Sequence, residues 1–250
     1  MEHYAGIDVS LELSSVCVVD ATGQIVREAK LASEPEALIG WLRGLDLELA
    51  RVGLEAGPLS QWLFAAMHEA DLPVELLETR HVRDAFKAMP VKTDRKDARG
   101  IAQLLRLGWF RPVHCKSASA QETRALLTAR KLLQSKYHDV EMSLRGVLRG
   151  FGLKVGRTTP RSFAARIREL VEGHATLTAI VEALLAARET LGAQLCGLEK
   201  RLRNQAREDE RAQLLMTVPG VGVIVALTFA AAVDDPGRFR SSKTVARTLA

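Results

Sequence analysis

The first hundred residues switch between two hydrophobic periods. Apolar residues alternate with polar ones in some segments and recur every third or fourth position in others, the periods of strands and helices respectively. From the alternation at 3–10, the short apolar run at 13–20 and the flanking turn residues we predict strands at 3–10, 13–20, 24–31, 51–56 and 73–77. From the helical spacing we predict a helix opening at a Ser33–Glu36 capping box, then helices at 59–70, 81–88 and 94–107.

The order of these elements is specific for a short list of folds. Three strands in series imply an antiparallel meander, and the later strands alternate with helices and are expected to be parallel. This is the order of a ribonuclease-H-like α/β domain. The segment 109–119 contains Pro112 and several small polar residues, so we place the end of this domain near residue 112.

Beyond residue 113 the chain is helical and shows heptad repeats. Two series of apolar residues recur every seven positions: Leu126, Leu133, Val140 and Val147, and then Leu177, Leu184, Leu191 and Leu198. Further apolar residues, including Tyr137, Leu144, Phe151, Val181 and Leu202, accompany them. We predict a helical hairpin or coiled-coil arm over 113–207, although Arg130 and Arg188 interrupt the series at equivalent places. A helical bundle without a partner remains an equal alternative to an oligomerisation arm.

A glycine-rich turn opens the last predicted helix. Val218-Pro219-Gly220-Val221-Gly222 is followed by an apolar, small-residue segment. This pattern is typical of a helix-hairpin-helix, in which backbone N–H groups at a helix start meet a DNA phosphate, so Gly220 and Gly222 are candidate DNA contacts. The same turn could instead serve only to pack two helices closely. We therefore predict a partial, all-α helix-hairpin-helix domain over 208–250.

Charge divides the chain into blocks. Residues 1–79 carry 4 Lys and Arg against 14 Asp and Glu, whereas residues 80–170 carry 21 against 7. A basic block of this length favours a phosphate-binding surface over a solvated helical face, which usually mixes both signs. Nucleic acid is the expected partner.

Composition excludes other classes of protein. Cys17, Cys115 and Cys196 lie far apart without a ligand-spaced histidine, which argues against a zinc site and is typical of reduced thiols. The sequence has no apolar run near the 20 residues or so that cross a bilayer, and its acidic start is not a signal peptide. We expect a soluble, cytoplasmic, nucleoid-associated protein with no membrane partner.

Four acidic residues stand out on this predicted scaffold. Asp8 lies on the first strand and Glu55 at the end of the fourth, which are neighbours in a ribonuclease-H-like sheet. Asp94 and Asp97 are three residues apart on one helix face, although a helix N-cap and first turn would explain that spacing equally well.

Four carboxylates at one point repel unless cations neutralise them, and Mg²⁺ or Mn²⁺ prefers such oxygen ligands. Two such ions about 4 Å apart can activate the attacking oxygen and stabilise the leaving oxygen of a phosphodiester. The basic side chains beside these acids, expected to hold phosphates, are Lys92, Arg95, Lys96 and Arg99.

Several motifs together resemble one family. GIDVS at 6–10, GLEAG at 53–57, KTDRKDA at 92–98, and VPGVG with DPGRFRSS between 218 and 242 resemble the insertion-sequence transposases related to the Piv DNA invertase. The resemblance implies a RuvC-like DEDD domain whose acids are Asp8, Glu55, Asp94 and Asp97, a coiled-coil region used in assembly, and a C-terminal transposase domain. It also implies a DNA recombinase acting on element ends and target DNA as a dimer or tetramer, in some members with a structured guide RNA.

The family's C-terminal domain is expected to continue beyond residue 250 into a stretch with a nucleophilic serine. Ser241 and Ser242 match the motif that precedes that stretch, and we assign neither the nucleophilic role. The chain thus resembles a truncated transposase. The rival functions are a RuvC-type Holliday-junction nuclease, which needs only the metal site, and an inactive nucleic-acid-binding remnant.

Overall fold

The computed structural model of the chain describes residues 1–86 and 94–249, apart from the side chains at 85, 94, 95 and 246–249. The described residues form two compact units, Met1–Lys116 and Ser117–Ala250. The predicted boundary at 207/208 lies inside the second unit and stays a prediction.

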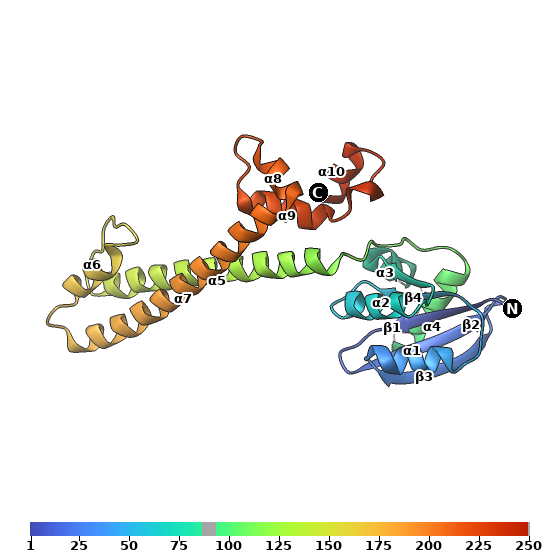
Figure 1. Cartoon of the computed structure of the whole chain (residues 1–250). Helices are drawn as coiled ribbons and strands as arrows, with labels where there is room; N and C mark the ends of the chain where they lie inside the picture. Colours follow the sequence, from blue (N-terminus) through green and yellow to red (C-terminus); the bar gives the residue numbers. More distant parts are fainter. Residues whose placement is uncertain (87–93, 250) are drawn as a thin grey trace. The chain divides into compact units, whose positions relative to one another are not determined.

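The first unit is built on a five-stranded sheet (Figure 1). Its strands are β1 (His3–Asp8), β2 (Leu13–Asp20), β3 (Ile25–Ala32), β4 (Leu49–Glu55) and β5 (Val74–Leu77). They lie in the order β3-β2-β1-β4-β5, with β1, β2 and β3 antiparallel and β1, β4 and β5 parallel. This mixed order confirms the predicted ribonuclease-H-like arrangement of the first domain.

Helices cover both faces of the sheet. Helices α1 (Pro35–Arg43) and α2 (Ser60–Glu69) pack on the face that carries Ala5, Ile7, Val52 and Leu54. Helices α3 (Thr79–Phe86) and α4 (Asp94–Arg106) pack on the opposite face. Successive side chains of a strand point to opposite faces, so Ala5 and Ile7 pack against α1 and α2 while Tyr4 packs with the opposite face.

One local prediction is wrong. The N-cap of α1 is Glu34, without a side-chain capping bond, and Ser33 does not cap the helix. Ser33 is buried, and its hydroxyl donates to the carbonyl oxygen of Ser10 (2.7 Å) and lies 2.8 Å from the hydroxyl of Ser14. These long-range bonds replace the local one.

The second unit is helical. Its elements are α5 (Ala118–Gly150), α6 (Phe163–Leu170), α7 (Ala175–Glu208), α8 (Glu210–Met216), α9 (Val223–Val233), the 3-10 turn η1 (Pro236–Arg238) and α10 (Ser242–Leu249). Helices α5 and α7 lie side by side, and Leu144, Leu148, Val181 and Leu185 are buried between them and α6 (Figure 1). Phe151 is 64% exposed, so its predicted place in the apolar seam is wrong.

The two arginines that interrupt the heptads pair across this helical hairpin. Arg130 of α5 contacts Glu199 of α7 at 2.7 Å, and Arg188 of α7 contacts Glu141 of α5 at 2.6 Å. Because one residue number rises as its partner's falls, α5 and α7 are antiparallel. The predicted hairpin is therefore present within one chain, whereas a coiled-coil supercoil and an oligomerisation role stay predictions.

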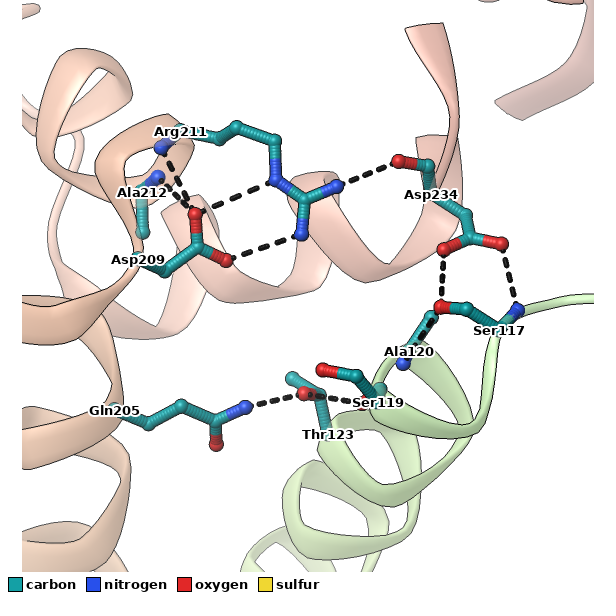
Figure 2. Close-up of polar contacts among 9 residues, drawn as sticks. All are labelled: Ser117, Ser119, Ala120, Thr123, Gln205, Asp209, Arg211, Ala212 and Asp234. Atoms are coloured by element: carbon teal, nitrogen blue, oxygen red, sulfur yellow. Dashed lines mark hydrogen bonds and ion pairs between the residues drawn. The ribbon is translucent and has the colours of Figure 1, made fainter.

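A polar network joins the start of α5 to α8 and α9 (Figure 2). The Asp234 carboxylate, just after α9, accepts from the Ser117 amide (2.8 Å) and hydroxyl (2.6 Å). The Asp234 carbonyl accepts from Arg211 (2.6 Å), and Asp209 caps α8 by accepting from the amides of Arg211 and Ala212. These bonds hold the start of α5 against the end of α9, and Arg211 ties the end of α9 to the start of α8.

Candidate active site

Asp8 and Glu55 are the last residues of neighbouring parallel strands. Ile7 of β1 pairs with Leu54 of β4, so the next residues, Asp8 and Glu55, lie side by side at one sheet edge. Carboxyl ends of parallel strands form the binding edge of many α/β sheets. Both acids line one pocket of about 350 Å³, which is formed by residues 8–11 and 55–60.

Two buried serines fix the loops of this pocket. The Ser60 hydroxyl accepts from the Gly57 amide (2.8 Å) and donates to the Gly57 carbonyl (2.7 Å), which closes the turn after Glu55. Ser33 holds the carbonyl of Ser10 on the other side. The pocket loops are thus held from both sides. Sequence reasoning missed Ser60, although the Gly57-Pro58 turn was a visible signal, and it gave Ser33 a different role.

Two glycines let α4 lie directly on the sheet. A Cβ atom at Gly6 would overlap the backbone of Ala98 and Ala102, and one at Gly53 would lie 2.6 Å from the Leu105 side chain. Gly6 and Asp8 share one face of β1, as do Gly53 and Glu55 on β4. Helix α4 therefore covers the face from which the two acids project.

The direction of α4 places its start at the acidic end of the sheet. Near the end of α4, Gln103 donates to the carbonyl of Gly23 in the β2–β3 turn (2.7 Å), which lies at the end where β1 begins. Ala98, one turn from the start of α4, lies over Gly6. The first turn of α4, which contains Asp94 and Asp97, is therefore directed toward the end of β1 that carries Asp8.

The structure brings together two of the four predicted acids, Asp8 and Glu55. Asp97 is half-buried on α4, and Asp94 is the first residue of that helix, with a side chain outside the described set. Among the described side chains, no group of three or more His, Cys, Asp or Glu is arranged to hold a metal ion. The oxygen donors of Asp8 and Glu55 nevertheless have the chemistry that Mg²⁺ and Mn²⁺ prefer.

The four basic residues predicted to bind phosphates differ from one another in their surroundings. Lys92 and the side chain of Arg95 lie outside the described residues, and Lys96 is exposed. Arg99 is bound to Glu28 of β3 through two nitrogens, with Nη2 2.8 Å from Oε2. This hydrogen bonding to Glu28 raises the pKa of Arg99 and ties α4 to β3.

Gly220 and Gly222 lie in the turn between α8 and α9. Gly220 has φ +85°, in the left-handed region that favours glycine, and Gly222 is the N-cap of α9. A Cβ atom at either glycine would meet no atom within 4 Å among those that the structure describes. Backbone conformation, and not close helix packing, therefore accounts for Gly220.

The class defined by this fold and site is a ribonuclease-H-like domain with paired carboxylates at the carboxyl ends of β1 and β4. A family profile described as "Transposase", of the DEDD type of IS110 elements, matches residues 5–152. A second, described as "Transposase IS116/IS110/IS902 family", matches residues 212–250. The chain belongs to the IS110 family of transposases.

Two similar curated proteins are also named as transposases. The chain is 26% identical over 250 residues to the transposase for insertion sequence element IS1111A of Coxiella burnetii, covering 95% of this chain and 65% of that protein. It is 26% identical over 251 residues to a probable family 20 transposase of Pseudomonas aeruginosa, covering 98% and 72% respectively. The chain thus spans just under two thirds of the length of the first of these relatives.

Among solved structures, the chain matches that of Thermus thermophilus RuvC. It is 18% identical, with a TM-score of 0.33, and the match covers 44% of this chain and 99% of that one.

Within the described residues, no helix combines the length and the apolar character that a membrane span requires.

Proposed function

We propose that this chain provides the metal-dependent site of a DNA transposase, a site-specific recombinase of a bacterial insertion sequence. The observation that carries the proposal is the pairing of Asp8 and Glu55 at the ends of neighbouring parallel strands, where both line one pocket. Family membership supplies the DNA substrate class.

Asp8 and Glu55, together with Asp97 and Asp94 from α4, are the residues that would hold Mg²⁺ or Mn²⁺. When bound, the cation supplies charge stabilisation at the attacking and leaving oxygens of a phosphodiester. The chain's own contribution is to fix the two strand carboxylates rigidly, since both terminate paired strands and the pocket loops are held by buried serines. Such rigid positioning reduces the reorganisation that the reaction requires.

The surrounding basic residues divide between binding and positioning. We assign Lys92, Arg95 and Lys96 to phosphates of the DNA beside the acids, because they flank the two acids at the start of α4. Arg99 keeps α4 on β3 through Glu28, so we assign it a positioning role instead of a phosphate contact.

The other partners are proposed from the resemblance of the sequence motifs to this family. We propose that the protein acts on double-stranded DNA of element ends and target as a homo-oligomer, with a structured guide RNA, and that Gly220 and Gly222 contact the DNA backbone. Size-exclusion chromatography with light scattering tests the oligomer, and recovery of a discrete bound RNA from the purified protein tests the guide.

A strand-exchange assay on supercoiled DNA carrying element ends tests the activity. Asp8→Asn and Glu55→Gln should abolish Mg²⁺-dependent processing, while Glu36→Gln, at an exposed position in the first turn of α1, should leave it unchanged. Undiminished processing by Asp8→Asn would refute the site. Hydrolysis of branched DNA without strand joining would select a junction nuclease instead, and nucleic-acid binding without any processing would select an inactive remnant.

A further inference from the structure

The connection between α5 and α6 is strongly basic. Residues 142–168 carry seven Lys and Arg and no Asp or Glu. Two of these cations are neutralised by acids further along the chain, Arg166 by Glu169 (2.8 Å) and Arg168 by Glu182 (2.7 Å). The others are Arg145, Arg149, Lys154, Arg157 and Arg161.

Three of these remaining cations surround one pocket. The pocket has a volume of about 240 Å³ and is lined by Arg145, Arg149, Leu153, Lys154, Val155 and Gly156. Arg145 and Arg149 are four residues apart on α5 and so share one helix face. We call this the cationic pocket.

Arg145 is held in place by its neighbours. Its guanidinium donates to the carbonyl of Gly156 (2.8 Å) and to the hydroxyl of Thr158 (2.9 Å), and lies 5.2 Å from the ring centroid of Phe163. None of these partners is a carboxylate, so the positive charge is oriented without being neutralised. A pre-oriented guanidinium loses little further freedom when it binds an anion.

Arg149 and Lys154 complete the charge of the pocket. Both side chains are exposed, and among the described residues neither forms an ion pair with an acid. Three cations around one concave surface repel each other, and an anion bound there relieves that repulsion.

An exposed aromatic side chain lies next to these cations in the chain. Phe151 caps the C-terminus of α5, two residues after Arg149, and is 64% exposed. A large exposed aromatic ring among basic residues is costly in water but provides a stacking surface for an unpaired base. An acidic peptide would use the cations but not the ring.

We propose that the cationic pocket binds a phosphate of an unpaired nucleic-acid strand and that Phe151 stacks on an adjacent base. This inference rests on the proposed function, because it assigns a strand-binding site outside the first unit to the same nucleic-acid-processing protein. Arg145, Arg149 and Lys154 neutralise the backbone, and Phe151 distinguishes unpaired from paired bases.

Fluorescence anisotropy with short labelled oligothymidylate and oligouridylate tests the site on the full chain. Arg149→Glu combined with Lys154→Glu should weaken binding at least about tenfold and flatten its dependence on salt concentration. The matched control makes the same charge change at Lys200 and Arg201, two exposed residues of α7 without an ion pair among the described residues. Equal binding by the two double variants would overturn the proposal.

The aromatic contact needs its own test. Phe151→Ala should weaken binding of the unpaired oligonucleotide about fivefold or more and leave binding of a short duplex unchanged. An equal effect on both, no effect on either, or equally tight binding of polyglutamate would contradict an unpaired-strand site. Thermal melting of each variant verifies the fold.

Failure of this site and failure of the proposed function are distinguishable. If the double variant at 149 and 154 still binds Mn²⁺ as the wild type does but loses the oligonucleotide, the strand site stands separately from the metal site. If the wild type binds Mn²⁺ but not the oligonucleotide, the strand site is wrong while the proposed function survives. Oligonucleotide binding that persists without Mn²⁺ binding supports the strand site and counts against the proposed function.

Discussion

Gly6 of β1 lies directly beneath the backbone of Ala98 in α4, with no room for a side chain between them. The obstructing atoms are the Ala98 carbonyl oxygen and the Ala102 amide nitrogen, which are main-chain atoms and cannot rotate away. The closeness of α4 to the sheet, and with it the position of Asp97, therefore depends on this glycine.

Gly6→Ala should displace α4 and destabilise the first unit by about 1–3 kcal/mol, the usual cost of overpacking. Urea unfolding followed by circular dichroism measures the change. The control is Gly40→Ala on α1, where no described atom lies within 4 Å of the added Cβ and alanine favours the helix by up to about 1 kcal/mol. Similar effects of the two substitutions would contradict the packing described for Gly6.

Arg188→Met tests the ion pair inside the α5–α7 hairpin. The side chains of Arg188 and Glu141 are only 10% and 19% exposed, and the Arg188 guanidinium also lies 4.5 Å from the Tyr137 ring centroid. Removing the arginine leaves a largely buried carboxylate unpaired, so we expect a loss of about 3 kcal/mol.

Arg168→Met is the matched control for that loss. The side chains of its pair with Glu182 are 55% and 44% exposed, so solvent screens the attraction and the loss should be clearly smaller than for the inner pair. Thermal or urea unfolding that gives equal losses for the two variants would show that burial does not set the strength of the inner pair.

The charge of Asp209 should make the second unit sensitive to acid. Burial alone would raise the pKa of this carboxyl, but hydrogen bonds from Arg211 and the amides of Ala212 and Arg211 outweigh it, and the pKa is lowered. The unfolded chain therefore takes up the proton more readily than the folded one. The stabilisation by Asp209 is present above its unfolded pKa of about 3.9 and is lost as the pH falls through the lower folded value.

Asp209→Asn isolates that charge, because asparagine also caps helices well. The wild type should be more stable than the variant near neutral pH, and the difference should shrink below about pH 4. Unfolding curves measured across this range provide the comparison. A difference that is constant or grows in acid would contradict the charge-based account.

The sequence predicted the sheet of the first unit because its strands are short alternating or apolar runs and its turns carry strong signals. The residues at 13–20 match β2 at both ends, the start of β1 and the end of β5 also match, and the other strand boundaries differ by one or two residues. Asp8 and Glu55 could be paired from topology alone, since parallel neighbouring strands end at the same edge.

Long-range contacts could not be predicted in the same way. Ser33 precedes a helix and so suggested a cap, but its bonds to Ser10 and Ser14 depend on how three strands meet. Arg99 belonged to a basic run and suggested a phosphate contact, yet Glu28 of a distant strand holds it. Glycines inside β1 and β4 were a usable signal for close helix approach, because glycine is otherwise unfavourable in a strand.

The heptad pattern predicted buried residues correctly inside the α5–α7 hairpin, but its prediction was wrong at the C-terminal end of α5. It predicted the buried residues Leu144 and Val181, but it also included Phe151, which caps the C-terminus of α5 and is 64% exposed. Periodicity describes one helix face and carries no information about where the partner helix ends.

Calorimetric titration of the full chain with Mn²⁺ tests the central claim, that Asp8 and Glu55 are halves of one metal site. We expect the wild type to bind the ion, Asp8→Asn and Glu55→Gln each to weaken binding at least about tenfold, and Glu36→Gln to bind normally. Unchanged binding by Asp8→Asn, or no binding by the wild type, would contradict it.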